Sequence, residues 1–150
     1  IITDKVYSST NVSESVKVMS DNLISDLLVN LANINQNHLI LDPCCGDGNL
    51  LMSAYNKLNN FNLDHNKILS KLHGIEIDKN LSQLCSFKLL SKNLIDINSK
   101  TETFIETTDY FKKNKFKNKY DVILMNPPYL RNEDLNIDDK ENWIFNIEKN

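Results

Sequence analysis

His38-Leu-Ile-Leu-Asp42-Pro-Cys-Cys-Gly46-Asp-Gly48 is the stretch of this sequence that decides the fold. Its first part, 38–42, is a short apolar run that ends at an acid, which is typical of a buried strand. The two glycines allow the backbone to turn tightly and to approach a ligand closely. After the turn, apolar residues recur at helical spacings: Leu50, Leu51, Ala54, Tyr55 and Leu58. Strand, glycine turn and helix in this order form the first half of a βαβ unit.

The alternation of strands and helices continues along the chain. The patterns predict strands at 72–77, 103–107 and 120–125, and a helix at 79–94. Such alternation favours a mainly parallel, doubly wound sheet with right-handed crossovers. The predicted fold class is therefore α/β and Rossmann-like.

A helix is also expected ahead of the first strand, within 13–34. Ser13 is a suitable N-cap for it. Its expected apolar face consists of residues at spacings of three and four: Val16, Met19, Leu23, Leu27 and Leu31.

The composition is that of an ordinary globular domain. The chain has 150 residues, of which 41% are hydrophobic and 25% charged, and this fits one domain with its own core. It contains no apolar run of about 18 residues, which excludes a transmembrane helix, and its start lacks the pattern of a secretory signal. Because the chain begins with Ile1, we expect it to be a piece of a longer protein.

The cysteines and the net charge argue against several classes of site. Cys44, Cys45 and Cys85 do not suggest a disulfide framework, because two are adjacent and the odd count leaves one unpaired. No zinc-like spacing is present either, so we expect reduced thiols, no metal and a cytoplasmic location. The formal net charge of −3 is unfavourable for binding nucleic acid by this chain alone.

Four polar residues stand at or just past the ends of the predicted strands: Asp42, Glu76, Asp109 and Asn126. In a parallel sheet, ligands bind beyond these carboxyl ends. Glu76 is placed to accept both hydroxyl hydrogens of an adenosine ribose. Since no third glycine follows Gly46 and Gly48 at the usual spacing, the turn favours a nucleoside over a dinucleotide pyrophosphate.

Asn126-Pro127-Pro128-Tyr129 follows the last predicted strand. Two prolines in succession cannot continue a strand and they stiffen the chain where it leaves the sheet. By itself this segment could simply end a strand and pack a tyrosine. Beside a nucleoside pocket, it indicates an amide oxygen and backbone carbonyls held as fixed acceptors, with an aromatic face next to them.

Together these motifs resemble those of the amino-methylating S-adenosylmethionine-dependent methyltransferases, whose signature is Asp/Asn/Ser-Pro-Pro-Tyr/Phe after the fourth strand. The turn 42–48 resembles their cofactor motif, 74–78 the strand end with their ribose-binding acid, and 108–111 their adenine-contacting segment. Ser9-Thr10-Asn11 resembles their Thr-Pro motif, although Asn11 stands in place of the proline. The order of the motifs is that of the gamma class of DNA adenine methyltransferases, including those found in restriction-modification enzymes.

The resemblance implies the class I methyltransferase fold and a set of site residues. The implied cofactor is S-adenosyl-L-methionine, bound by Thr10, Asp42, Pro43, Cys44, Gly46, Gly48, Glu76, Ile77, Asp109 and Tyr110. Ile77 is given two readings, contact with the adenine ring of the cofactor or burial in the core. The implied catalytic residues are Asn126, Pro127 and Tyr129, and the implied substrate-binding residues are Asn126, Pro128 and Tyr129.

The resemblance also implies a division of the chain and its partners. It divides the chain into a leading helical segment (1–36), a region with the cofactor and catalytic motifs (37–129), and the start of the following loop (130–150). The implied reaction is methylation of the N6 amino group of a flipped-out adenine. Double-stranded DNA would be bound through a target-recognition domain that these 150 residues do not contain, and a fused nuclease or a specificity subunit would be the further partner.

Several polar residues are expected to lie outside the site. We interpret Asp47 and Asp78 as solvated or capping residues. His38, His65 and His73 form no constellation with other catalytic residues, and we interpret them as structural.

Three other functions remain open. RNA methyltransferases that act on guanine or adenine amino groups carry Asn-Pro-Pro-Tyr too, as do enzymes that methylate a release-factor glutamine. The glutamine enzymes usually resemble Asp-Leu-Gly-x-Gly-x-Gly at the cofactor turn, which this turn does not match, and the RNA enzymes usually carry an RNA-binding domain ahead of it. A third alternative is a cofactor-binding subunit that has no catalytic activity and works with a partner.

Overall fold

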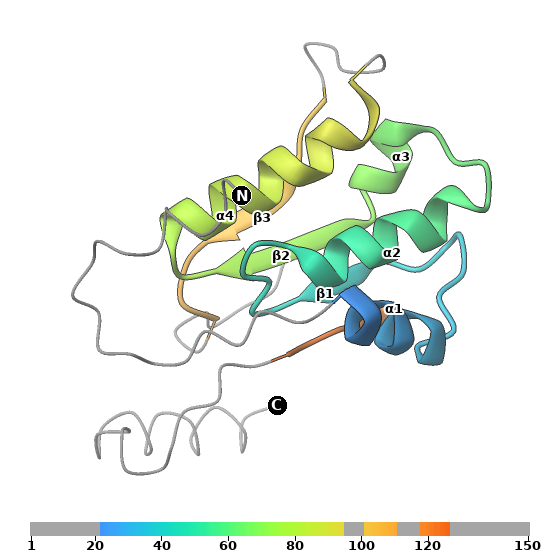
Figure 1. Cartoon of the computed structure of the whole chain (residues 1–150), viewed down its shortest axis with the longest axis horizontal. Coiled ribbons are helices and arrows are strands. Elements are labelled where there is room, and N and C mark those ends of the chain that lie inside the picture. The colour runs from blue at the N-terminus through green and yellow to red at the C-terminus, as the bar shows by residue number, and fades with distance from the viewer. Residues whose placement is uncertain (1–21, 95–100, 111–117, 127–150) are drawn as a thin grey trace.

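The structure is a computed structural model that describes residues 22–94, 101–110 and 118–126. Helices and strands alternate along these ranges (Figure 1). In chain order they are α1 (Asn22–Leu31), β1 (Ile40–Asp42), α2 (Asn49–Asn59), α3 (His65–Leu69), β2 (Leu72–Glu76), α4 (Lys79–Leu90), the 3₁₀ helix η2 (Ser91–Asn93), β3 (Phe104–Thr107) and β4 (Val122–Ile123).

The four described strands form one sheet in the order β3-β2-β1-β4, and every neighbouring pair is parallel. In the register, Ile40 of β1 lies between Leu72 of β2 and Val122 of β4. Parallel neighbours need crossover connections, and here α2 and α3 connect β1 to β2 while α4 connects β2 to β3. The predicted α/β, Rossmann-like class is confirmed.

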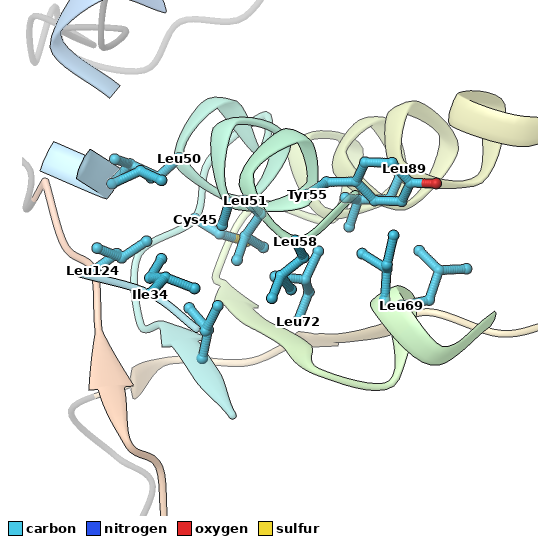
Figure 2. Close-up of a cluster of buried hydrophobic side chains, with 14 of the residues drawn as sticks. Ile34, Cys45, Leu50, Leu51, Tyr55, Leu58, Leu69, Leu72, Leu89 and Leu124 are labelled. Carbon is cyan, nitrogen blue, oxygen red and sulfur yellow. The ribbon is translucent and has the colours of Figure 1, made fainter. Parts of the chain in front are cut away.

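The core lies between this sheet and the described helices. Because Ile40, Leu72 and Val122 occupy one row of the register, their side chains project from one face of the sheet. The same core cluster contains side chains from all four α-helices, so those helices cover that face. Leu51 and Leu58 of α2 are fully buried in it, and Figure 2 shows them between α2 and the strands. Burying each such side chain contributes about 1.5–3 kcal/mol.

The caps explain where the helices begin. Asp78 caps α4, since its side chain accepts hydrogen bonds from the N–H groups of Asn80 and Leu81. This confirms the capping role that was one of its two expected roles. Asp64 caps α3 in the same manner, through the N–H of Lys67. The sequence patterns did not predict α3, a helix of only five residues, because it is too short to show a period.

The expected apolar face of the first helix is wrong for the part that the structure describes. Leu23, Leu27 and Leu31 are 77%, 58% and 73% exposed, while Ser25 and Val29 are buried against α2. The reason is that α1 carries apolar residues on more than one side, and the side that contains Val29 packs on α2. Residues 13–21 of the expected helix lie outside the described ranges.

The histidines have structural contacts. The Tyr55 hydroxyl and His65 Nδ1 are 2.8 Å apart and buried. The ring of His73 stacks on that of Phe104 with centroids 4.9 Å apart. The three cysteines are free thiols, and Cys85 is fully buried. Within the described ranges, none of the helices has the length and apolar character needed to cross a membrane.

Candidate functional site

Four of the residues predicted for the site, all within the described ranges, lie at one edge of the sheet. Asp42 and Glu76 are the last residues of β1 and β2, and Asp109 and Asn126 follow β3 and β4. Because all these strands are parallel, their carboxyl ends meet at the same edge. The turn from Asp42 to Gly48 leaves the sheet at its centre.

Backbone hydrogen bonds fix this turn against β2. Cys45 N donates to Ile75 O at 2.9 Å, and Gly48 N donates to Cys45 O at 2.8 Å. The Asp42 carboxylate accepts a hydrogen bond from Cys44 N at 3.1 Å. Pro43 lies buried in the same turn. These hydrogen bonds give the turn a fixed backbone conformation.

The two glycines of the turn serve different purposes. Both have a positive φ, +54° at Gly46 and +91° at Gly48. A Cβ on Gly46 would meet nothing within 4 Å, whereas a Cβ on Gly48 would lie 2.5 Å from Cys85 Sγ. Gly46 thus leaves an open surface against which a ligand can lie, and Gly48 allows α4 to approach the start of α2.

The Glu76 carboxylate is held in place from two sides. Its Oε2 accepts a hydrogen bond from Gly46 N and its Oε1 one from Asp78 N, both at 2.8 Å. A carboxylate can accept about four hydrogen bonds, so Glu76 keeps acceptor capacity for further donors such as a pair of hydroxyls. The two hydrogen bonds fix the orientation of this carboxylate.

Three carboxylates influence the thiol of Cys44. Burial raises the pKa of Cys44 to about 11, and the negative charges of Asp42, Glu76 and Asp109 add to this rise. Burial also raises the pKa of Asp42 to about 7. The hydrogen bond from the N–H of Cys44 opposes this rise, and the negative charge of Glu76 adds a smaller increase to the pKa. Cys44 is therefore a neutral thiol at pH 7 and not a nucleophile, and this edge of the sheet attracts positive charge.

The segment after β3 lies beside Glu76. Thr108 N donates to Glu76 O at 3.0 Å, and Asp109 and Tyr110 follow it, both half-buried. Ile77 is 67% exposed, so the interpretation of Ile77 as a core residue is wrong. An exposed aliphatic side chain directly after Glu76 is available to contact a flat ring.

Asn126 leaves the sheet beside the turn. Leu124 N donates to Leu41 O at 2.9 Å, which ties the end of β4 to the end of β1. Asn126 follows two residues later and is half-buried. Four other residues predicted for the site lie outside the described ranges: Thr10, Pro127, Pro128 and Tyr129.

One pair at the turn was not predicted. Asp47, expected to be solvated or capping, is 8% exposed and forms an ion pair with Lys88 of α4, with Oδ2 and Nζ 2.6 Å apart. Asp47 and Lys88 are far apart in the sequence, and no periodic pattern connects them. Among the described residues, no group of His, Cys, Asp and Glu side chains is arranged to hold a metal ion.

Comparison with known proteins connects this geometry to one family. The family model described as N-6 DNA Methylase matches residues 5–149. The chain is 32% identical over 118 residues to the "Type II restriction enzyme and methyltransferase RM.BcgI" of Heyndrickxia coagulans, covering 75% of this chain and 18% of that protein. It is 32% identical over 116 residues to the "Type II methyltransferase M.BanIII" of Aneurinibacillus aneurinilyticus, covering 71% of this chain and 19% of that protein.

A solved structure shares the fold. It is that of a modification subunit of a putative type I restriction enzyme from Vibrio vulnificus YJ016, with a TM-score of 0.64 and 22% identity, and it covers 77% of this chain and 24% of that chain. The matched part of this chain covers about a fifth of the length of RM.BcgI and of M.BanIII.

Proposed function

Since this chain belongs to the N-6 DNA methylase family, we propose that it holds the cofactor pocket and the catalytic segment of a site-specific DNA adenine methyltransferase. The proposed reaction transfers a methyl group from S-adenosylmethionine to the N6 amino group of adenine. The observation that carries the proposal is the Glu76 carboxylate, which Gly46 N and Asp78 N hold at 2.8 Å beside the open face of Gly46.

The residues at the carboxyl edge fit S-adenosylmethionine. Glu76 has acceptor capacity for the two ribose hydroxyls, exposed Ile77 offers an apolar contact for the adenine ring, and Asp109 can accept from the adenine amino group. The open side of Gly46, where a Cβ would meet nothing within 4 Å, leaves room for the methionine part. The cofactor carries a positively charged sulfur, and the carboxylates at this edge favour a cation.

Other predicted residues complete the proposed pocket. Asp42, Pro43, Cys44 and Gly48 form the turn that would face the methionine end, and Tyr110 adds to the adenine side. Thr10 is proposed to contact the methionine end as well. When bound, S-adenosylmethionine supplies an electrophilic methyl group.

Asn126 is the proposed catalytic residue. An aromatic amino group is a poor nucleophile because its lone pair is delocalised into the ring. Asn126 Oδ1 would accept a hydrogen bond from one N–H of the target amino group, and the carbonyl of Pro127 would accept one from the other N–H. These two bonds would draw the nitrogen towards a tetrahedral shape and free its lone pair. An amide oxygen suits this role because it accepts a hydrogen bond without carrying a charge.

Positioning of the base is the second part of the mechanism. Holding two reacting groups in contact can contribute about 7–11 kcal/mol to catalysis. An adenine inside a duplex must first be flipped out, which costs about a few kcal/mol. Tyr129, together with Pro128, would bind the flipped base, and stacking on an aromatic ring contributes about 1–3 kcal/mol.

DNA recognition would come from outside this chain. The net charge of −3 does not favour phosphate binding by these residues alone. We therefore propose that a target-recognition domain or a specificity subunit brings double-stranded DNA to the carboxyl edge, in a cytoplasmic restriction-modification system. A fused nuclease is a further part of this proposal, and the description of the RM.BcgI protein as both restriction enzyme and methyltransferase supports it.

The test is methyl transfer by the full-length protein with radiolabelled S-adenosylmethionine. We expect label in duplex DNA, and we expect Asn126→Ala to reduce transfer at least about 100-fold, a size typical for removing one fixed hydrogen-bonding group from a transition state. Calorimetry should show unchanged binding of the cofactor. The matched control is Asn60→Ala, at an exposed position after α2, which should keep full activity.

Two results would contradict the proposal. Full activity of Asn126→Ala would remove the catalytic role of this residue. Label that enters RNA or protein and never DNA would show that the substrate class is wrong.

A further inference from the structure

Lys88 of α4 contacts the turn 42–48, which is the proposed cofactor-binding turn, and the first residue of α2. Its Nζ lies 2.6 Å from Asp47 Oδ2 and 3.3 Å from Asn49 Oδ1. The side chain of Asp47 is 9% exposed and that of Lys88 30%. Because the pair is largely removed from water, its attraction is screened less than that of a surface pair.

Asp47 occupies the position between the two glycines of the turn. On one side of it, Gly46 N donates to Glu76 Oε2. On the other side, Gly48 is the N-cap residue of α2, and it lies so close to Cys85 that a Cβ on it would be 2.5 Å from Cys85 Sγ. The helix α4 therefore contacts the turn at Cys85 and again, one helical turn later, at Lys88.

We propose that Lys88 is a positioning residue for the cofactor, acting through Asp47 on the backbone of 46–48. This inference rests on the proposed function. Removing the amine would leave a largely buried carboxylate without its counter-charge, which is strongly unfavourable. The Asp47 carboxylate would then turn towards water and displace Gly46, whose N–H orients the carboxylate of Glu76.

The test is the dissociation constant of S-adenosylmethionine, measured by calorimetry on the full-length protein. We expect Lys88→Met to raise this dissociation constant about tenfold or more. Metal sites lose affinity by a similar factor when a residue that orients a metal-binding side chain is replaced. Asp47→Asn leaves the Lys88 ammonium without its counter-charge, but that side chain is 30% exposed and keeps its contact with Asn49 Oδ1, so the dissociation constant should rise only about threefold. The double variant should bind no worse than Asp47→Asn because the two effects are coupled. Lys88→Arg keeps the charge and should restore most of the affinity.

A matched control separates positioning from loss of charge. Lys92→Met removes the same charge one helical turn further on, where Lys92 Nζ contacts Asn56 Oδ1 at 2.8 Å instead of the turn. Its affinity for the cofactor should equal that of the wild type. Thermal unfolding of every variant without cofactor shows whether the protein remains folded.

The outcomes distinguish this inference from the proposed function. If the wild type binds S-adenosylmethionine and both Lys88→Met and Asp47→Asn bind it equally well, Lys88 has a structural role only and the inference is wrong. Should Lys88→Met fail to fold, Asp47→Asn alone decides by the same criterion. A wild type that does not bind the cofactor would overturn the proposed function, and this inference with it.

Discussion

Asp42 shows how a single buried carboxyl group couples the site to pH. Its side chain is 1% exposed, and burial raises its pKa from 3.8 to about 7. Between pH 3.8 and about pH 7, the Asp42 carboxyl group of the folded protein keeps a proton that the unfolded chain has released. The contribution of Asp42 to stability is therefore fully present below about pH 4 and is lost as the pH rises towards 7.

Asp42→Asn should remove this dependence. Asparagine cannot ionise, and its Oδ1 can still accept the hydrogen bond from Cys44 N. We expect the variant to become more stable relative to the wild type between pH 5 and pH 8, by up to a few kcal/mol. Urea unfolding of both proteins at several pH values measures the difference, in which the other titrating groups cancel. A difference that does not change with pH would contradict the raised pKa.

Sequence reasoning predicted which residues stand at the carboxyl edge of the sheet but not all of their contacts. Glu76 and Asp109 could be placed because Glu76 ends a recognisable strand and Asp109 follows the next one, and parallel strands bring such positions to one edge. The Asp47–Lys88 pair could not be placed, because it depends on how α4 crosses the start of α2. The neutral state of Cys44 could not be derived either, since it follows from burial and three neighbouring charges.

At the scale of elements, the junction of α2 and α4 depends on Gly48. Gly48 is the N-cap residue of α2, which has no side-chain cap there. The close contact with Cys85 leaves no space for a Cβ, and Cys85 is fully buried. Any side chain at position 48 must therefore displace the side chain of Cys85 or push α4 away from the turn.

Gly48→Ala and Gly46→Ala form a matched pair that isolates this contact. Both glycines have a positive φ, +91° and +54°, but only Gly48 has a close neighbour. We expect Gly46→Ala to lower the free energy of unfolding by about 1–2 kcal/mol, the backbone strain alone. Gly48→Ala should lower it by about 1–3 kcal/mol more, as overpacking of a core does. If denaturant unfolding shows that both variants lose the same free energy of unfolding, the contact with Cys85 can relax without cost.

The elements themselves were largely predictable from periodicity. The apolar runs and helical spacings predicted β1, β2, β3, α2 and α4 within a few residues. The exposed face of α1 was missed because its leucines follow the helical period as well as its buried residues do. Only the contact with α2 decides which face is covered, and that contact is not encoded in the spacing.

At the scale of the whole molecule, stability depends on the core cluster between the described helices and the sheet. Leu51 of α2 is fully buried there, whereas Leu27 of α1 is 58% exposed. Both are leucines within helices, so their replacement by alanine removes the same atoms. Leu51→Ala should lower the free energy of unfolding by about 2–5 kcal/mol, and Leu27→Ala should change it by less than about 0.5 kcal/mol. Chemical denaturation measures both, and a large loss for Leu27→Ala would show that its side is covered in solution.

The central place of β1 has a consequence for how the protein is made. One edge of β1 is paired early, through Ile40 N and Lys71 O at 2.9 Å, but the other edge needs Asp121 and Leu124, whose N–H groups donate to Leu39 O and Leu41 O at 2.9 Å. Chains emerge from the ribosome beginning with the N-terminus, so a nascent chain that stops before Asp121 presents a bare apolar strand edge. Such edges pair with other chains. Premature termination between β3 and β4 would thus yield an aggregation-prone fragment. A nascent chain on a ribosome that pauses there would need chaperones to protect this edge.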